Sequence, residues 1–134
     1  MKENKDWKII LYVDENGCPV NDFIETLPLA SKKKLYSAIE YLKEIGAFLH
    51  RPQADILRDG IHELRVQLKG EKTRTLYFFC YEDYIVLTHT FIKRTKQVPE
   101  KEIDRALAYK ENFLEKYSQI NIKEVYSASG FHKI

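Results

Sequence analysis

Three strand-like runs follow one another between residues 62 and 94, and they restrict the fold of this chain more than any other feature. Residues 62–69 alternate between apolar and polar side chains, which is the period of a strand with one buried face. Gly70 begins a short turn into residues 73–81, which are mostly apolar on both faces, as in a central strand. An acidic turn then leads into residues 85–94. The sequence therefore predicts an antiparallel meander of three strands.

The last of these runs passes without a break into a basic cluster formed by Lys93, Arg94 and Lys96. Pro99 and the acidic residues after it are a helix-start signal, which places the cluster in a strand-to-helix turn. Side chains alternate between two faces along a strand, so the cations begin where the strand leaves the core. One predicted face carries Ile85, Leu87, His89, Phe91 and Lys93, and the other carries Val86, Thr88, Thr90, Ile92 and Arg94.

The residues before the meander supply one more strand and two helices. Residues 7–13 are mainly β-branched and aromatic and are followed by turn residues, which is typical of a strand. Apolar side chains recur at helical spacing in residues 20–27 and again in residues 35–45. Gly46 is the expected C-terminal cap of the second helix. Residues 47–60 show no clean period, and we expect them to form a loop.

A third helix is predicted over residues 100–117. The tail after it holds one candidate short element at residues 120–126. Three roles for the tail stay open: completing a sheet edge, mediating dimerisation, or remaining disordered. We expect a single domain over residues 1–117 and a C-terminal extension of unknown structure over residues 118–134.

The size and composition of the chain exclude several classes of protein. At 134 residues it can bury the core of one domain without metals or disulfides. The formal charge of +2 identifies no partner, but residues 62–96 hold seven cationic and four acidic side chains, a local excess of +3. Cys18 and Cys80 have no zinc-type spacing, so we expect no metal, disulfide or cofactor. No stretch approaches the roughly 20 apolar residues of a membrane span, and we expect a cytoplasmic protein.

Three short motifs connect this chain to a known family. They are Glu-Leu-Arg at residues 63–65, Arg-Thr-Leu-Tyr-Phe-Phe at residues 74–79, and Phe-Ile-Lys-Arg-Thr-Lys at residues 91–96 followed by Pro99. With the order β-α-α-β-β-β-α, they resemble the RelE/ParE superfamily of type II toxin-antitoxin toxins, and most closely its HigB-like, phage-derived branch. The resemblance covers residues 7–117. It implies a RelE-like α+β fold: a small twisted antiparallel sheet with two N-terminal helices, one C-terminal helix and an open basic concavity.

The resemblance also implies an activity and partners. Active members are metal-independent endoribonucleases that cut messenger RNA in the ribosomal A site. A cognate antitoxin encoded nearby silences them, and we expect it to be a small helix-turn-helix protein. The expected assemblies are a homodimer or a toxin-antitoxin heterotetramer. The alternative is a non-nucleolytic toxin that inhibits DNA gyrase in the manner of ParE, or a phage accessory binding protein.

Metal-free RNA cleavage requires a base for the 2′-OH proton, cations for the phosphorane and an acid for the 5′-oxygen. Arg65 and Arg74 lie on neighbouring predicted strands and can form a fork on the scissile phosphate. His89 titrates near neutrality and is the first candidate for proton transfer. Lys93 is the fourth candidate catalytic residue, because it can hold a phosphate or the developing charge. The candidate RNA-binding residues are Lys69, Lys72, Tyr77, Arg94 and Lys96, with Tyr77 stacking on a base or donating its hydroxyl.

Each candidate also has a purely structural interpretation. Cations on the polar face of a strand are mostly solvated. A histidine between Leu87 and Phe91 is often a hydrogen-bonded core residue, and Tyr77 lies in a strand suited to core packing. We favour a functional role for the arginine pair and leave both interpretations of His89 and Tyr77 open.

Overall fold

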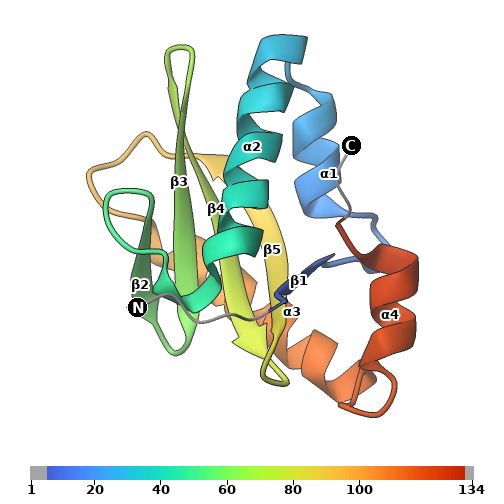
Figure 1. Ribbon diagram of the computed structural model, residues 1–134. Helices are drawn as coiled ribbons and strands as arrows, with labels where there is room; N and C mark the ends of the chain where they lie inside the picture. The colour runs from blue at the N-terminus through green and yellow to red at the C-terminus, as the bar shows by residue number, and fades with distance from the viewer. Residues whose placement is uncertain (1–5, 132–134) are drawn as a thin grey trace.

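The computed structural model describes residues 6–131, and its central element is a five-stranded sheet (Figure 1). The strands lie in the order β1-β5-β4-β3-β2. β1 runs parallel to β5, and every other neighbouring pair is antiparallel. The strands are β1 (Lys8–Leu11), β2 (Ala54–Arg58), β3 (Ile61–Leu68), β4 (Glu71–Cys80) and β5 (Tyr84–Ile92).

Helices cover both faces of the sheet (Figure 1). On one face, α1 and α2 close a core with β3, β4 and β5, and on the other, α3 and α4 close a second core. The helices are α1 (Pro19–Glu25), α2 (Leu29–Ile45), α3 (Glu100–Lys116) and α4 (Ile122–Ser129), with a 3-10 turn η1 (Gly46–Phe48) after α2. Within residues 6–131, none of the helices combines the length and apolar character that a membrane span requires.

The period-two pattern of β3 divides its side chains between the two faces, as the sequence predicts. Leu64 and Val66 enter the core beneath α1 and α2, whereas Ile61 belongs to the core beneath α3. β4 is buried on both sides because Tyr77 faces the first core and Phe78 the second. The predicted meander and the α+β class are therefore confirmed.

The predicted cap of α2 is also confirmed. Gly46 has a φ of +60°, and its N–H donates to the carbonyl of Leu42. A Cβ on this residue would collide with the indole of Trp7. Gly46 therefore combines a positive φ with a close approach of the Trp7 side chain, and both favour glycine.

Two predictions about the sheet are wrong. Residues 47–60 are not only a loop, because they contain the edge strand β2. Within residues 6–131, β2 is an edge strand that pairs only with β3, its burial shows no regular alternation, and its register shifts between Ile56 and Arg58. The sheet is also not wholly antiparallel, because β1 inserts parallel to β5, with Ile9 opposite Ile85. Helices α1 and α2 and the meander separate these two strands in the chain, so no local pattern encodes their direction.

The C-terminal extension completes the edge of the sheet beside β1. Gly130 forms an isolated bridge with Ile10, and the N–H of Phe131 donates to the carbonyl of Ile9 over 2.7 Å. Ile122 of α4 is buried in the second core. Completing a sheet edge, one of the three roles left open for the tail, thus describes residues 118–131; residues 132–134 lie outside the described part.

A β-bulge in β5 changes which side chains share a face. Tyr77 pairs with Leu87 and Leu76 with His89, so Thr88 is the extra residue. Leu87 lies in the core beneath α1 and α2, whereas Phe91 packs against the core beneath α3. The prediction that Ile85, Leu87, His89 and Phe91 share one face is therefore wrong, because the alternation is reset at Thr88.

Candidate functional site

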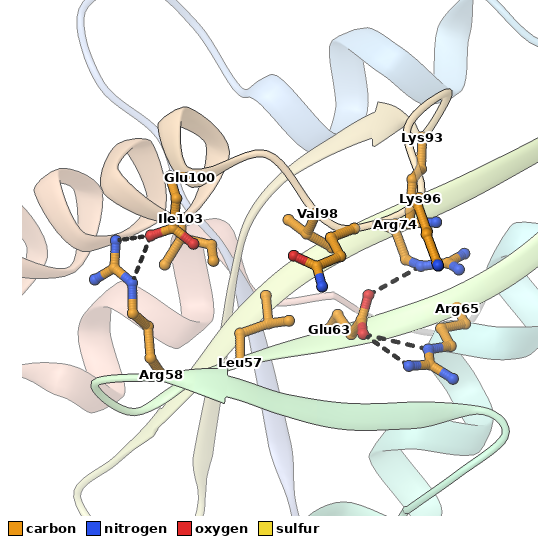
Figure 2. A pocket seen from close by; sticks show the side chains of 11 residues that line it. Leu57, Arg58, Glu63, Arg65, Arg74, Lys93, Lys96, Val98, Glu100 and Ile103 are labelled. Atoms are coloured by element: carbon orange, nitrogen blue, oxygen red, sulfur yellow. Dashed lines mark hydrogen bonds and ion pairs between the residues drawn. The ribbon is translucent and has the colours of Figure 1, made fainter.

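A pocket of about 480 Å³ opens at the end of the sheet, on the face covered by α3. It lies between β2, β3 and β4 on one side and the connection from β5 to α3 on the other (Figure 2). Four of the predicted site residues line it: Arg65, Arg74, Lys93 and Lys96. The other lining residues are Leu57, Arg58, Glu63, Gln97, Val98, Glu100 and Ile103.

Strand register brings the two arginines together. Arg65 lies directly opposite Arg74 in the antiparallel pairing of β3 with β4. Alternation along β3 places Arg65 on the same face as Glu63, and both side chains line the pocket. Like charges directly opposite one another in a sheet are destabilising, so this arrangement requires a compensating charge.

Glu63 supplies that charge. Its Oε1 lies 2.9 Å from Arg74 Nε, and its Oε2 lies 3.1 Å from Arg65 Nη2, so one carboxylate bridges both guanidiniums (Figure 2). The Arg74 contact is an ion pair without hydrogen-bond geometry. Glu63 is only 3% exposed, and Asp55 of β2 lies 3.4 Å from Arg65 on the other side. We call Arg65, Glu63 and Arg74 the Arg-Glu-Arg triad.

Glu63 is a site residue to which the sequence pattern assigns no role. From the sequence alone, Glu63 counts only as one of the acidic residues of the segment 62–96 and as part of the Glu-Leu-Arg motif. Its position two residues before Arg65 in an alternating strand is the available signal, since that spacing places both side chains on one face.

Two lysines from the turn after β5 extend the basic end of the pocket. The backbone N–H of Lys93 donates to the carbonyl of Lys72 over 2.7 Å, which fixes this turn against β4. Desolvation, together with the neighbouring charges of Arg74 and Lys72, lowers the pKa of Lys93 below its usual value. Four cations line this end of the pocket against the carboxylates of Glu63 and Asp55, so it carries a net positive charge.

The opposite end of the pocket is partly apolar and borders an ion-pair group in which carboxylates outnumber the one arginine. Leu57, Val98 and Ile103 lie between the triad and a second ion-pair group (Figure 2). In that group, Arg58 Nη2 lies 2.9 Å from Glu100 Oε1 and 2.8 Å from Asp104 Oδ1. These contacts connect the end of β2 to the first turns of α3.

The remaining predicted cations lie around the pocket rather than in it. Lys72 is exposed on β4, two residues before Arg74, and Lys69 is exposed in the β3-β4 turn. Arg94 is exposed and lines a separate hollow with Phe91. The sequence thus identified the basic strand ends, and the structure divides their side chains among different surfaces.

His89 is buried and lies outside the pocket. It is 1% exposed, its Nε2 lies 3.1 Å from Glu102 Oε1, and its Nδ1 lies 3.0 Å from Thr88 Oγ1. Burial, followed by the charge of Arg105, lowers the pKa of His89, although Glu102 opposes the shift. This environment matches the interpretation of His89 as a hydrogen-bonded core residue rather than as a group that exchanges protons with a ligand in the pocket.

Tyr77 is also remote from the triad. It lies in the core on the α1 and α2 face of the sheet and is 1% exposed, with its ring stacked 5.2 Å from His62. Burial raises the pKa of its hydroxyl far above the usual range. The core-packing interpretation of Tyr77 therefore fits its surroundings, and a base cannot stack on this ring without unfolding.

We expect the free energy of unfolding to rise with pH between the folded pKa of His89 and about 6.5, the ordinary histidine value. Burial lowers the folded pKa, so the unfolded chain binds more protons in this window. Lowering the pH from 7 to 5 should therefore cost about 1–2 kcal/mol through His89. The pKa of His62 is lowered too, mainly by burial, and adds a contribution of the same sign. Urea unfolding at pH 5, 6 and 7 measures the slope.

His89→Gln should flatten this pH dependence, because glutamine keeps a donor for Glu102 but does not titrate. The matched control is His50→Gln, since His50 is exposed. An unchanged slope in His89→Gln would contradict the assignment of the low pKa to His89.

The pocket has the chemistry of an anion site with a built-in carboxylate. Guanidinium groups bind phosphate bidentately, and a carboxylate held between them can accept a proton from a hydroxyl brought beside that phosphate. Among residues 6–131, no group of three or more His, Cys, Asp and Glu side chains is arranged to hold a metal ion.

The match to a protein family covers the region that contains the triad. Residues 22–111 match the family described as phage-derived protein Gp49-like. A chain of the crystal structure of the archaeal RelE-RelB complex from Pyrococcus horikoshii OT3 is similar at 14% identity and a TM-score of 0.46, over 69% of this chain and 100% of that one. No curated protein matches the chain.

Proposed function

The chain belongs to the Gp49-like family of phage-derived proteins, a RelE/HigB-like toxin family, and we propose that it is a toxin that cleaves messenger RNA on the ribosome. In this proposal the reaction needs no metal ion, takes place in the cytoplasm and is controlled by a cognate antitoxin. The substrate phosphate binds at the basic end of the pocket, beside the Arg-Glu-Arg triad.

The triad is the observation that carries this proposal. Two arginines face each other across strands β3 and β4, a charge repulsion that packing alone does not require. The carboxylate between them is almost fully buried, yet both arginine side chains remain partly accessible, 31% exposed for Arg65 and 12% for Arg74. Two cations around one carboxylate leave a net positive charge that lines the pocket, and a phosphate bound there can neutralise it.

Each member of the site has a role in the proposed reaction. Glu63 accepts the proton of the 2′-OH, whose oxygen then attacks the adjacent phosphorus. Arg65 and Arg74 stabilise the dianionic phosphorane. Lys93 donates a proton to the departing 5′-oxygen, a role favoured by its lowered pKa. The P–O5′ bond breaks, and the products are a 2′,3′-cyclic phosphate and a 5′-hydroxyl.

Expression of the protein in a bacterium tests this function. New 5′-hydroxyl ends within translated messenger RNA should appear within minutes of induction, and plasmid supercoiling should not change. Loss of supercoiling without new RNA ends would instead favour the gyrase-inhibitor alternative. Growth arrest that Arg74→Ala does not relieve would remove the triad from the mechanism.

We also propose that the antitoxin is a small helix-turn-helix protein that covers the basic end of the pocket with an acidic or amphipathic segment. Charge complementarity to Arg65, Arg74 and Lys93 supports this arrangement. Co-expression with the neighbouring gene should restore growth and yield a complex that survives purification. Failure of the two proteins to associate would count against a toxin-antitoxin pair.

The basic cluster after β5 should determine how RNA affinity depends on salt. Replacing Lys93, Arg94 and Lys96 together by Gln should lower the slope of log affinity against log salt by about 0.7 for each phosphate that the variant no longer neutralises. Fluorescence anisotropy with a labelled single-stranded RNA at several salt concentrations measures this slope. The matched control replaces Lys32, Lys33 and Lys34 of α2 by Gln, which removes the same charge on the opposite face of the sheet. Equal slopes in the two triple variants would exclude the cluster from the RNA-binding surface.

A further inference from the structure

A second hollow of about 410 Å³ lies next to the pocket, between α1 and the first turn of α3. Its apolar walls are formed by Phe23 of α1, Phe91 and Ile92 at the end of β5, and Pro99. Arg94 and Lys101 are exposed at its rim. We call this hollow the Phe91 pocket, and the one beside the triad the triad pocket.

The two pockets share the connection between β5 and α3 as their common wall. Lys93 and Lys96 line the triad pocket, whereas Arg94, between them in sequence, lines the Phe91 pocket. Consecutive side chains of one segment thus point to opposite sides. A single-stranded chain bound in the triad pocket needs to cross only this segment to reach the Phe91 pocket.

The Phe91 ring is supported by an aromatic contact with a buried side chain. His89 stacks against it with ring centroids 5.6 Å apart and an angle of 27° between the planes. His89 is in turn held by Glu102 of α3, 3.1 Å from its Nε2. Glu102 also lines the Phe91 pocket, so its carboxylate, Arg94 and Lys101 leave that pocket with a net positive charge.

We propose that the Phe91 pocket binds one base of the same RNA strand whose phosphate occupies the triad pocket. The base lies against the rings of Phe91 and Phe23, and Arg94 and Lys101 contact the phosphate that links it to the cleaved position. An aromatic wall next to cations is the combination that binds single-stranded nucleic acid, because each nucleotide offers a π-face and a negative charge. The inference rests on the proposed function.

Abasic substitution tests the pocket directly. A fluorescein-labelled RNA that carries a 2′-deoxy nucleotide at the cleaved position cannot react, and an abasic residue is placed at each flanking position in turn. Binding is followed by fluorescence anisotropy. With the parent protein, loss of the base at one flanking position should weaken binding by about tenfold, since a stacked base contributes that order of affinity.

Phe91→Leu should weaken binding of the intact RNA by a similar factor, because leucine keeps the apolar contact but cannot stack. In this variant the abasic substitution at the sensitive position should have no further effect, which is the signature of coupling in a double-mutant cycle. The matched control is Phe48→Leu, since Phe48 lies on η1, is exposed and lines neither pocket. It should leave both affinities unchanged.

Additive effects of Phe91→Leu and the abasic residue at every position would overturn the inference. So would a Phe91→Leu variant that binds RNA normally but has a weakened affinity for the antitoxin, because the Phe91 pocket would then be a protein-binding site. Arg74→Ala, measured with the same RNA, separates the two proposals. RNA binding that depends on Arg74 but not on Phe91 would reject only the proposal that the Phe91 pocket binds a base. A parent protein that neither binds nor cleaves RNA would reject both that proposal and the proposed function.

Discussion

Arg74→Ala is expected to lower RNA cleavage by about 10²-fold or more, close to the roughly 3 kcal/mol lost when one preorganised charge-stabilising donor is removed. Arg74 lies opposite Arg65, and its side chain is only 12% exposed, so its guanidinium is held in place and needs little reorganisation to meet a phosphorane. The measurement is single-turnover cleavage of a messenger RNA on ribosomes with an excess of toxin.

Arg74→Lys should recover part of this loss, because lysine keeps the charge but cannot form a bidentate contact with phosphate. The fold should survive in both variants, since Arg65 still neutralises Glu63 at 3.1 Å. Circular dichroism and co-purification with the antitoxin check that both variants keep the fold. Arg105→Ala is the control, because Arg105 is an exposed arginine of α3 outside both pockets. Cleavage by Arg74→Ala at the parent rate would show that Arg74 is only a structural charge.

Glu63→Gln is expected to separate RNA binding from cleavage. As the proposed base, Glu63 should contribute about 10²–10⁴-fold to the rate, and glutamine cannot accept the proton. Glutamine nevertheless fills the same space between Arg65 and Arg74, and it removes a negative charge that lies 2.9 Å from a proposed phosphate ligand. Affinity for an uncleaved RNA should therefore stay equal or rise while cleavage falls.

Glu63→Gln is informative because it is expected to lower the cleavage rate without lowering the affinity for RNA. Asp55→Asn is its matched control, because Asp55 also pairs with Arg65, at 3.4 Å, but lies on β2 away from Arg74. It should affect affinity in the same direction and leave the cleavage rate nearly unchanged. Parallel losses of affinity and rate in Glu63→Gln would mean that Glu63 only organises the arginines. An unchanged rate would exclude it as the base.

Much of the site followed from local sequence patterns. The strict alternation of residues 62–69 and the short turn at Gly70 place Arg65 and Arg74 on adjacent strands. The structure pairs them directly. Glu63 could have been added by the same reasoning, since it shares the alternation of Arg65, but its charge alone did not indicate that it bridges two cations.

His89 shows where such reasoning fails. Uninterrupted alternation predicted that it shares the α1 and α2 face with Leu87, but the bulge at Thr88 turns it to the α3 face, where it is buried against Glu102 and does not line the triad pocket. A bulge depends on how β5 meets β4, and the sequence of β5 alone does not show it. Arg94 illustrates the same limit, because its position beside Phe91 depends on where α1 and α3 lie.

The sequence by itself determined the α+β class, the three-stranded meander, the helix boundaries near Gly46 and Pro99, and the meeting of Arg65 with Arg74. These features depend on side-chain period and turn chemistry, which are properties of neighbouring residues. Only the tertiary structure decided the parallel insertion of β1 beside β5, the edge strand β2, the burial of His89 and the position of Glu63 between two guanidiniums. Each of these depends on contacts between segments that are distant in the chain or on a break in strand alternation, and the free energy of such contacts is not encoded in any local window of sequence.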